Sequence, residues 1–129
     1  MDSPIQNRIG CIFIPVSDMT RARRWYERLL GLPPSTISHA DRIADLPMLS
    51  ETQLILDSHK PVVNSSPPLL FFWTDDVRTT AEFLQQIGVE IVRPIEDIGS
   101  VSTPVIKDPD HNLLMICQRN PDTADIATT

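Results

Sequence analysis

The amino-acid sequence predicts an α+β fold in which one strand–helix unit is used twice along the chain. Each copy contains, in order, an apolar run, an aspartate at a turn, a helical period and a closing glycine. The two copies span residues 9–32 and 69–89. Gly31 follows Asp18 by 13 residues and Gly88 follows Asp76 by 12, so the two spacings differ by a single residue. A small sheet with one helix leaves an apolar face exposed, and we therefore expect two half-domains that share a core.

The first module, residues 8–57, should begin with a strand and a helix. Residues 9–16 are apolar on both alternations, which is typical of a strand that is covered on both faces. Asp18, or Ser17 before it, can cap the helix that follows, and Gly31 ends that helix. The apolar residues at helical spacing are Met19, Ala22, Tyr26, Leu29 and Leu30. Three short strand candidates come next, at residues 36–39, 42–46 and 53–56.

The second module, residues 69–118, repeats this order. Residues 58–68 are rich in proline and serine and form the expected linker between the modules. A strand at 69–73 precedes a helix that Asp76 can cap, in which Val77, Ala81, Leu84 and Ile87 should face inward. Three further strands are expected at residues 89–93, 102–106 and 113–117, with the turn DPDHN before the last of them. We expect residues 119–129, which are polar, to form a flexible tail.

Composition narrows the classes of protein to which the chain can belong. With 129 residues it is long enough for one domain with a core, and 11 basic against 17 acidic residues give a net charge of −6. This charge argues against nucleic acid or an anionic membrane surface as the partner, and we expect neither nucleic acid nor a membrane to be bound. Cys11 and Cys117 lie in apolar runs, and neither a signal peptide nor a membrane-spanning run is evident, so we expect a cytoplasmic protein with reduced thiols.

Five short motifs in this order resemble the glyoxalase, bleomycin-resistance and extradiol dioxygenase superfamily, also called vicinal oxygen chelate proteins. They are VSDM at 16–19, WYERLLGL at 25–32, TDDV at 74–77, Gly88-Val89, and DPDHN at 108–112, where the family usually has DPDGN. The resemblance covers roughly residues 8–118. It implies a single glyoxalase-like domain of two βαβββ modules, with sheets curled around a central cleft and helices outside. It also implies a homodimer, because family members are often dimers.

Many members of this family hold one divalent metal in the cleft, where it acts as a Lewis acid on two substrate oxygens. The resemblance puts the four ligand positions at Cys11, about Leu54 or Ile55, Leu69 and Met115. Only Cys11 among these side chains can bind such a metal. Gln53 would reach the cleft after a one-residue shift, yet two ligands still fall short of the three or four that a mononuclear site needs. We therefore expect no family-type metal centre and no cofactor.

The remaining candidate residues have plain structural explanations. His39 lies on a short polar strand and His59 in the linker, so each is expected to be a surface histidine. His111 replaces the glycine of the family's turn, and a turn residue is its leading interpretation. Cys11 is a weak candidate for a nucleophile, because no histidine is near it in sequence and an apolar strand raises its pKa. The cluster Arg21, Arg23 and Arg24 is expected to form a solvated helix face.

The side chains that share the cleft face can be found by alternation along each strand. This face is almost wholly apolar and contains Cys11, Phe13, Leu69, Phe71, Trp73, Leu113, Met115 and Cys117. We predict that Cys11, Phe13, Leu69, Phe71, Trp73, Met115 and Cys117 bind a hydrophobic or aromatic small molecule. The alternative is that these side chains fill the cleft and leave no pocket.

Three functional hypotheses follow, and the fold cannot choose among them. The favoured one is a metal-free protein that binds a small molecule without catalysis, similar to the antibiotic-sequestering branch of the family. The alternative is a metal-dependent lyase, isomerase or dioxygenase of the glyoxalase type whose ligands have moved. The third is a paralogue that has lost its ligand and is retained for interaction with another protein.

Overall fold

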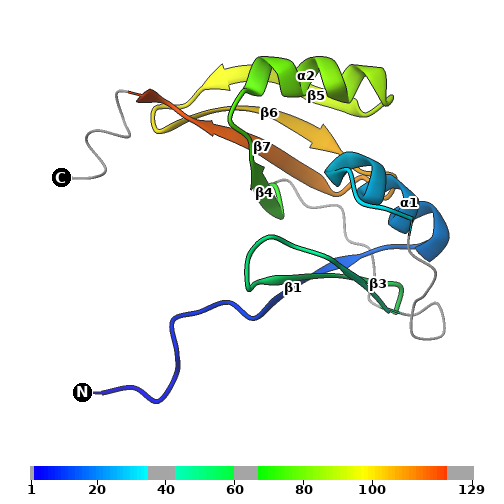
Figure 1. The fold of residues 1–129 in the computed structure, drawn as a ribbon, viewed down its shortest axis with the longest axis vertical. Helices are drawn as coiled ribbons and strands as arrows, with labels where there is room; N and C mark the ends of the chain where they lie inside the picture. The colour runs from blue at the N-terminus through cyan, green and yellow to red at the C-terminus, as the bar shows by residue number, and fades with distance from the viewer. Residues whose placement is uncertain (1, 35–42, 60–66, 122–129) are drawn as a thin grey trace. The chain divides into compact units, whose positions relative to one another are not determined.

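The computed structural model describes residues 2–34, 43–59 and 67–121 of the chain. By its contacts the chain divides into two compact units, residues 1–62 and residues 63–129 (Figure 1). This division falls within the predicted linker, residues 58–68, of which residues 60–66 lie outside the described part. Among the described residues, no helix has the length and apolar character that crossing a membrane requires.

The first unit contains one helix and a three-stranded sheet in its described part. Its elements are β1 (Cys11–Pro15), α1 (Met19–Leu30), β2 (Ile43–Leu46) and β3 (Gln53–Asp57). The strand order is β1-β3-β2, with β1 parallel and β2 antiparallel to β3. Helix α1 contacts β2 and β3. The strand candidate at residues 36–39 lies outside the described residues, so that part of the predicted module is not described.

The boundaries of α1 arise from its capping residues, as the sequence predicts. Asp18 has an extended backbone, and its carboxylate accepts a hydrogen bond of 3.0 Å from the Arg21 backbone N–H. At the other end Gly31 has φ 66°, a left-handed conformation that residues with a Cβ adopt only with strain. The stripe of Met19, Ala22, Tyr26 and Leu29 is buried, so packing of this face stabilises the helix.

The second unit has the full strand–helix–strand–strand–strand order. Its elements are β4 (Leu70–Trp73), α2 (Val77–Gln86), β5 (Glu90–Asp97), β6 (Val101–Lys107) and β7 (Leu113–Arg119). The strand order is β4-β7-β6-β5, in which β4 is parallel to β7 and the other neighbours are antiparallel. Helix α2 contacts β5, β6 and β7 and lies along the sheet (Figure 1).

The first turn of α2 has all of its backbone donors satisfied. The Asp76 carboxylate accepts hydrogen bonds of 3.1 Å from the N–H groups of Arg78 and Thr79. The Val77 N–H donates to the side-chain oxygen of Gln118 on β7, at 2.7 Å. A long-range bond from the last strand therefore completes a cap that the sequence assigns to Asp76 alone.

The turn at residues 108–112 is held by its own side chains, and the predicted role of His111 is confirmed. The Asp108 carboxylate accepts bonds of 2.8 Å from the N–H groups of Asp110 and Asn112, and one of 2.9 Å from the Asn112 amide. His111 is exposed and has φ 69°. It is the turn residue that takes the left-handed conformation usually given to glycine.

Two expectations differ from the structure. The flexible tail was expected from residue 119, but Arg119 belongs to β7 and Asn120 donates to Asp97 and accepts from Ser102, at 2.8 and 2.7 Å. These bonds tie the chain to the turn between β5 and β6; residues 122–129 lie outside the described part.

The first strand was expected to be covered on both faces, yet Phe13 on β1 is 52% exposed.

Candidate functional site

The four-stranded sheet of the second unit has one face toward α2 and one open face. On the parallel pair β4 and β7, Phe71 is in register with Met115 and Trp73 with Cys117, so these four side chains share a face. Gln118, the next residue on β7, points to the opposite face, where its oxygen reaches α2. The face that carries Phe71 and Trp73 is therefore the one that α2 does not cover.

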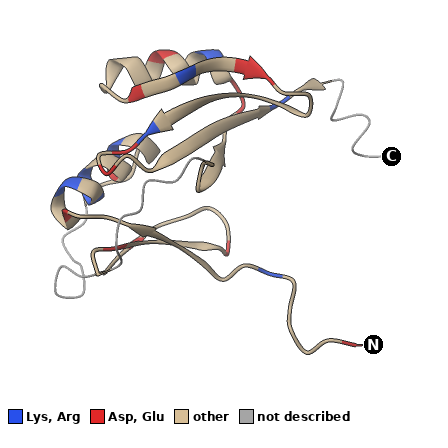
Figure 2. Ribbon diagram, turned by 180° about the vertical axis from the view of Figure 1, so that it is seen from behind, with Lys and Arg blue, Asp and Glu red and all other residues tan. Residues whose placement is uncertain are grey.

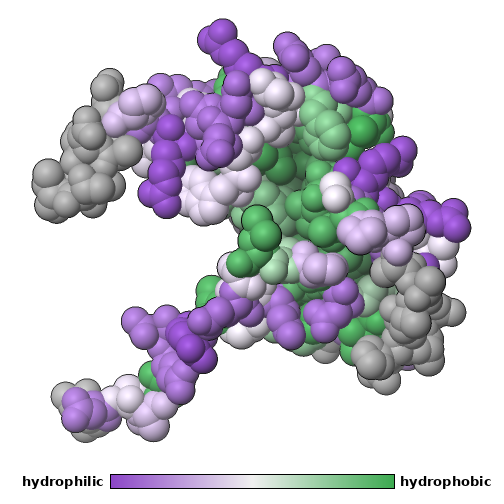
Figure 3. Space-filling model, in the orientation of Figure 1, coloured by the Kyte–Doolittle hydropathy of each residue, from purple (hydrophilic) through white to green (hydrophobic). Residues whose placement is uncertain are grey.

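Two aromatic side chains dominate this open face. Phe71 is 45% and Trp73 53% exposed, and their ring centroids lie 4.8 Å apart with the planes at 82°. This edge-to-face geometry is a favourable one for aromatic pairs. Figure 3 shows hydrophobic residues exposed on the surface among hydrophilic ones. We call Phe71, Trp73 and Met115 the aromatic face.

The other predicted residues of this unit differ in their exposure. Leu69 immediately precedes β4 and is 40% exposed, and its N–H donates to the Leu113 carbonyl at 2.9 Å. Cys117 shares this face of the sheet but is only 1% exposed, so neighbouring groups cover its thiol. Burial raises the pKa of Cys117, and a hydrogen bond with Thr103 partly opposes that rise. Cys117 is therefore a protonated thiol in the interior at neutral pH.

Cys11 and Phe13 belong to the first unit, on β1. They are in register with Gln53 and Ile55 of β3, and these four side chains share a face of the three-stranded sheet. Desolvation by burial, followed by the negative charge of Asp45, raises the pKa of Cys11. The expectation that Cys11 is a poor nucleophile agrees with this direction. A joint role of Cys11 and Phe13 with the aromatic face stays a prediction.

The side chains at the positions where the family holds its metal do not fit a hard divalent ion. In the first unit, Leu54 is buried and points away from Cys11, while Ile55 and Gln53 are on the Cys11 face. In the second unit the positions hold Leu69 and Met115, neither of which offers an oxygen or nitrogen donor. Within residues 2–34, 43–59 and 67–121, no group of three His, Cys, Asp or Glu side chains is placed to hold a metal ion.

A small hollow borders the aromatic face at the end of β7. It has a volume of about 220 Å³ and is lined by Trp73, Thr74, Asp75, Gln118 and Arg119. The Arg119 guanidinium carbon lies 4.3 Å from the centroid of the Trp73 ring, within the range of a cation–π interaction. Arg119 lies two residues after Cys117 on β7, so the two side chains share a face of the strand. The sequence predicted a strand only as far as residue 117, so Arg119 was not among the predicted site residues, although β7 extends to it.

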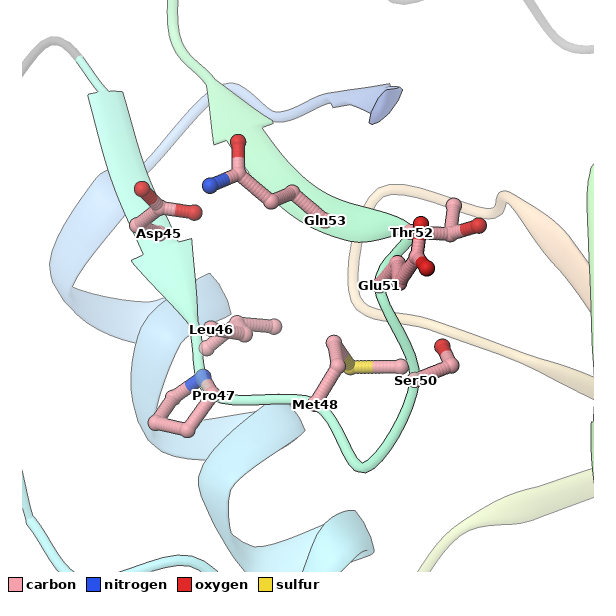
Figure 4. A pocket seen from close by; sticks show the side chains of 8 residues that line it. All are labelled: Asp45, Leu46, Pro47, Met48, Ser50, Glu51, Thr52 and Gln53. Atoms are coloured by element: carbon pink, nitrogen blue, oxygen red, sulfur yellow. The ribbon is translucent and has the colours of Figure 1, made fainter. Parts of the chain in front are cut away.

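A second hollow lies in the first unit, in the connection between β2 and β3 (Figure 4). It has a volume of about 420 Å³ and is lined by Asp45, Leu46, Pro47, Met48, Ser50, Glu51, Thr52 and Gln53. Figure 4 shows Asp45 and Gln53 projecting from the neighbouring strands. The sequence patterns did not point to this hollow, whose lining comes largely from a turn.

A third hollow follows the outer surface of α1. It has a volume of about 390 Å³ and is lined by Asp18, Thr20, Arg21, Arg24, Trp25 and Arg28. Figure 2 shows, in blue, the positions of the basic residues along this helix. Arg21, Arg24 and Arg28 are exposed, whereas Arg23 is half-buried. The predicted solvated face therefore contains Arg21 and Arg24, with Arg28 in the place of Arg23.

Comparison with solved structures finds the same fold in proteins with different descriptions. TnmS3, an antibiotic binding protein from Streptomyces sp. CB03234, is 24% identical, with a TM-score of 0.73 over 92% of this chain and 100% of its own. A virulence protein from Salmonella typhimurium is 25% identical, with a TM-score of 0.67 over 90% of this chain and 99% of its own. A lactoylglutathione lyase from Agrobacterium tumefaciens is 13% identical, with a TM-score of 0.68 over 88% of this chain and 95% of its own.

Sequence comparison identifies the family. No curated protein matches this chain. The model of the Glyoxalase/Bleomycin resistance protein/Dioxygenase superfamily matches residues 8–116, which is most of the chain. The two-sheet α+β architecture and the structural neighbours agree with that match. The chain therefore belongs to the Glyoxalase/Bleomycin resistance protein/Dioxygenase superfamily.

Proposed function

We propose that this protein binds a hydrophobic or aromatic small molecule on the aromatic face and does not transform it. The observation that carries the proposal is the pair Phe71 and Trp73, which are in ring contact yet about half exposed. Aromatic rings usually bury most of their surface, and exposed apolar patches are a mark of binding sites. A planar ligand would remove this surface from water.

The chemistry of the face suits such a ligand. Burial of apolar surface contributes roughly 25 cal/mol per Å², and a well-placed aromatic contact adds about 0.5–1.5 kcal/mol. Met115 is in register with Phe71 and supplies a flexible, polarizable side chain that adapts to different ring shapes. These terms favour an aromatic ligand without the need for any reactive group.

Binding without catalysis is proposed because the predicted site residues supply few reactive groups. Both cysteines have a raised pKa and remain protonated at neutral pH. The side chains at the family's metal positions do not fit a hard ion. TnmS3 offers a precedent for ligand binding on this fold, while the lactoylglutathione lyase has the same fold, so similarity of fold does not decide between binding and catalysis.

The direct test is a titration of tryptophan fluorescence. The chain has two tryptophans, so a Trp25→Phe variant leaves Trp73 as the only indole. We expect planar aromatic compounds to change its emission and to bind with micromolar or better affinity. Phe71→Ala should weaken binding, whereas Phe83→Ala, which removes an exposed phenylalanine on α2, should not. An unchanged emission across a chemically broad set of aromatic compounds would contradict the proposal.

Metal analysis tests the alternative of a glyoxalase-type lyase, isomerase or dioxygenase. We expect the protein purified without chelators to contain no stoichiometric Zn, Ni, Mn or Fe. A stoichiometric ion that is lost in Cys11→Ala or Gln53→Ala would favour the metal-dependent enzyme and overturn the proposal.

We also propose the cytoplasm as the protein's location, since free Cys11 and Cys117 suit a reducing compartment.

A further inference from the structure

We propose that the ligand of the aromatic face is an aromatic carboxylate, and that Arg119 binds its carboxylate group. This inference rests on the proposed function and specifies the chemical class of the ligand. The ring would lie against Phe71 and Trp73, and the carboxylate would enter the adjoining hollow of about 220 Å³. That volume is below the roughly 300–1,000 Å³ of pockets that enclose whole drug-sized ligands, so the hollow suits a small polar group.

Arg119 has the position and the free donors that this role requires. Its guanidinium carbon lies 4.3 Å from the Trp73 ring centroid, which holds the positive charge at the border of the aromatic face. A cation–π contact uses the charge of the group and leaves the N–H donors in the guanidinium plane available. Within the part of the chain that the structure describes, no carboxylate pairs with Arg119. An unpaired guanidinium suits bidentate recognition of a carboxylate.

Gln118 also lines this hollow and carries a second group with N–H donors. Its side-chain oxygen accepts the Val77 N–H at 2.7 Å, and because a backbone N–H can only donate, this bond determines which end of the amide faces the helix. The amide nitrogen therefore points away from Val77 and keeps two N–H donors. The donors of the first turn of α2 are already used, by Gln118 and by Asp76. Arg119 and Gln118 are thus among the donors of the hollow that remain for an anion.

Asp75 lines the same hollow and opposes the binding of an anion. The distance between its carboxylate and the Arg119 guanidinium exceeds that of an ion pair, so Asp75 lowers the local positive potential without neutralising Arg119 directly. The whole chain, with a net charge of −6, also repels anions at long range. A preference for an anionic ligand would therefore have to come from Arg119 and Gln118.

The test compares three probes that share one ring system and differ in charge. Calorimetric titration would measure 1-naphthoate, neutral 1-naphthamide and cationic 1-naphthylmethylammonium against the full chain. We expect the order naphthoate, naphthamide, naphthylmethylammonium in decreasing affinity. Arg119→Gln should weaken naphthoate binding about tenfold, the usual effect of one charge-assisted contact, and change naphthamide binding little. The naphthoate affinity of Arg119→Lys should lie between that of the unchanged protein and that of Arg119→Gln, because lysine keeps the positive charge and lacks the planar guanidinium.

Two further variants control for net charge and for folding. Arg93→Gln removes an exposed arginine from β5, a strand that β6 separates from β7, and should change naphthoate affinity by less than about twofold. Asp75→Asn should strengthen naphthoate binding, an effect that a misfolded protein cannot produce. Equal binding of naphthoate and naphthamide, or equal effects of Arg119→Gln and Arg93→Gln, would overturn the inference and leave the proposed function intact. Absence of binding by all three probes would count against both.

Discussion

His111 is the one non-glycine residue with positive φ among the described residues, and its backbone is strained in this conformation. We expect His111→Gly to raise the free energy of unfolding by about 0.5–1 kcal/mol, because glycine adopts this conformation without a Cβ clash. Urea denaturation would measure the change. His59→Gly is the matched control, since His59 lacks a positive φ, and there the added freedom of the unfolded chain should lower stability slightly. Equal effects at both positions would contradict the assignment of strain to His111.

Cys11 provides a second prediction at the level of single residues. The carboxylate of Asp45 contributes to the raised pKa of Cys11, so Asp45→Asn should lower that pKa and increase the thiolate fraction near about pH 8. We expect the alkylation of Cys11 by iodoacetamide to become a few-fold faster. Cys11→Ser leaves only the buried Cys117 and should react slowly under the same conditions. An alkylation rate unaffected by Asp45→Asn would show that the two groups do not interact.

Single residues also show which parts of the site could be predicted from sequence. The places of Phe71 and Trp73 on one face of β4 follow from strand alternation with its fixed period of two, whereas Met115 of β7 was assigned to that face through the family resemblance. Arg119 was not found, because its importance depends on the stacking against Trp73, a residue far away in the chain. Gln118 was missed for the same reason, since its partner is the N–H of Val77. Neither of these long-range contacts leaves a local sequence pattern.

At the scale of the element, the cap of α2 should make stability depend on acid pH. Hydrogen bonds from the backbone and then the side chain of Thr79 lower the pKa of Asp76 below its usual 3.8. Because the folded-state pKa is the lower one, this contribution to stability is present above the unfolded-state value and is lost as pH falls through the folded-state value.

The variant Asp76→Asn tests this dependence of stability on acid pH, since asparagine also caps helices but its amide does not titrate at acid pH. We expect the difference in unfolding free energy between the two proteins to shrink as the pH is lowered from neutral to below about 4. Urea denaturation at a series of pH values would measure it. A constant difference between wild type and Asp76→Asn at all pH values would contradict the linkage.

The elements themselves were largely predictable, and their ends less so. Asp18 and Gly31 bound α1 as expected, because caps and left-handed glycines act locally. Strand β5 extends to Asp97, beyond the predicted end at residue 93, although it contains Pro94. Proline is tolerated there because β5 is an edge strand with shifts in register, and neither property can be read from a single segment.

At the scale of the whole molecule, the internal repeat predicted the βαβββ order that the second unit has in full. The repeat was detectable because each copy uses the same local signals for its turn and its helix end. The pairing of β4 with β7 was not detectable in this way, since a parallel register between distant strands has no local signature. The open face, and hence the candidate site, depends on that pairing as much as on the aromatic residues themselves.

Exposed apolar side chains and net charge together lead to a prediction about assembly. Large apolar residues outside the aromatic face are exposed on both units, among them Phe13, Val92 and Ile98. A homodimer, which we propose for this chain, would cover part of this surface but must bring together two chains of net charge −6. We expect light scattering to give twice the chain mass of 14.5 kDa, with the dimer fraction increasing with ionic strength as salt screens the repulsion. The mass of a single chain at every protein and salt concentration would contradict the homodimer.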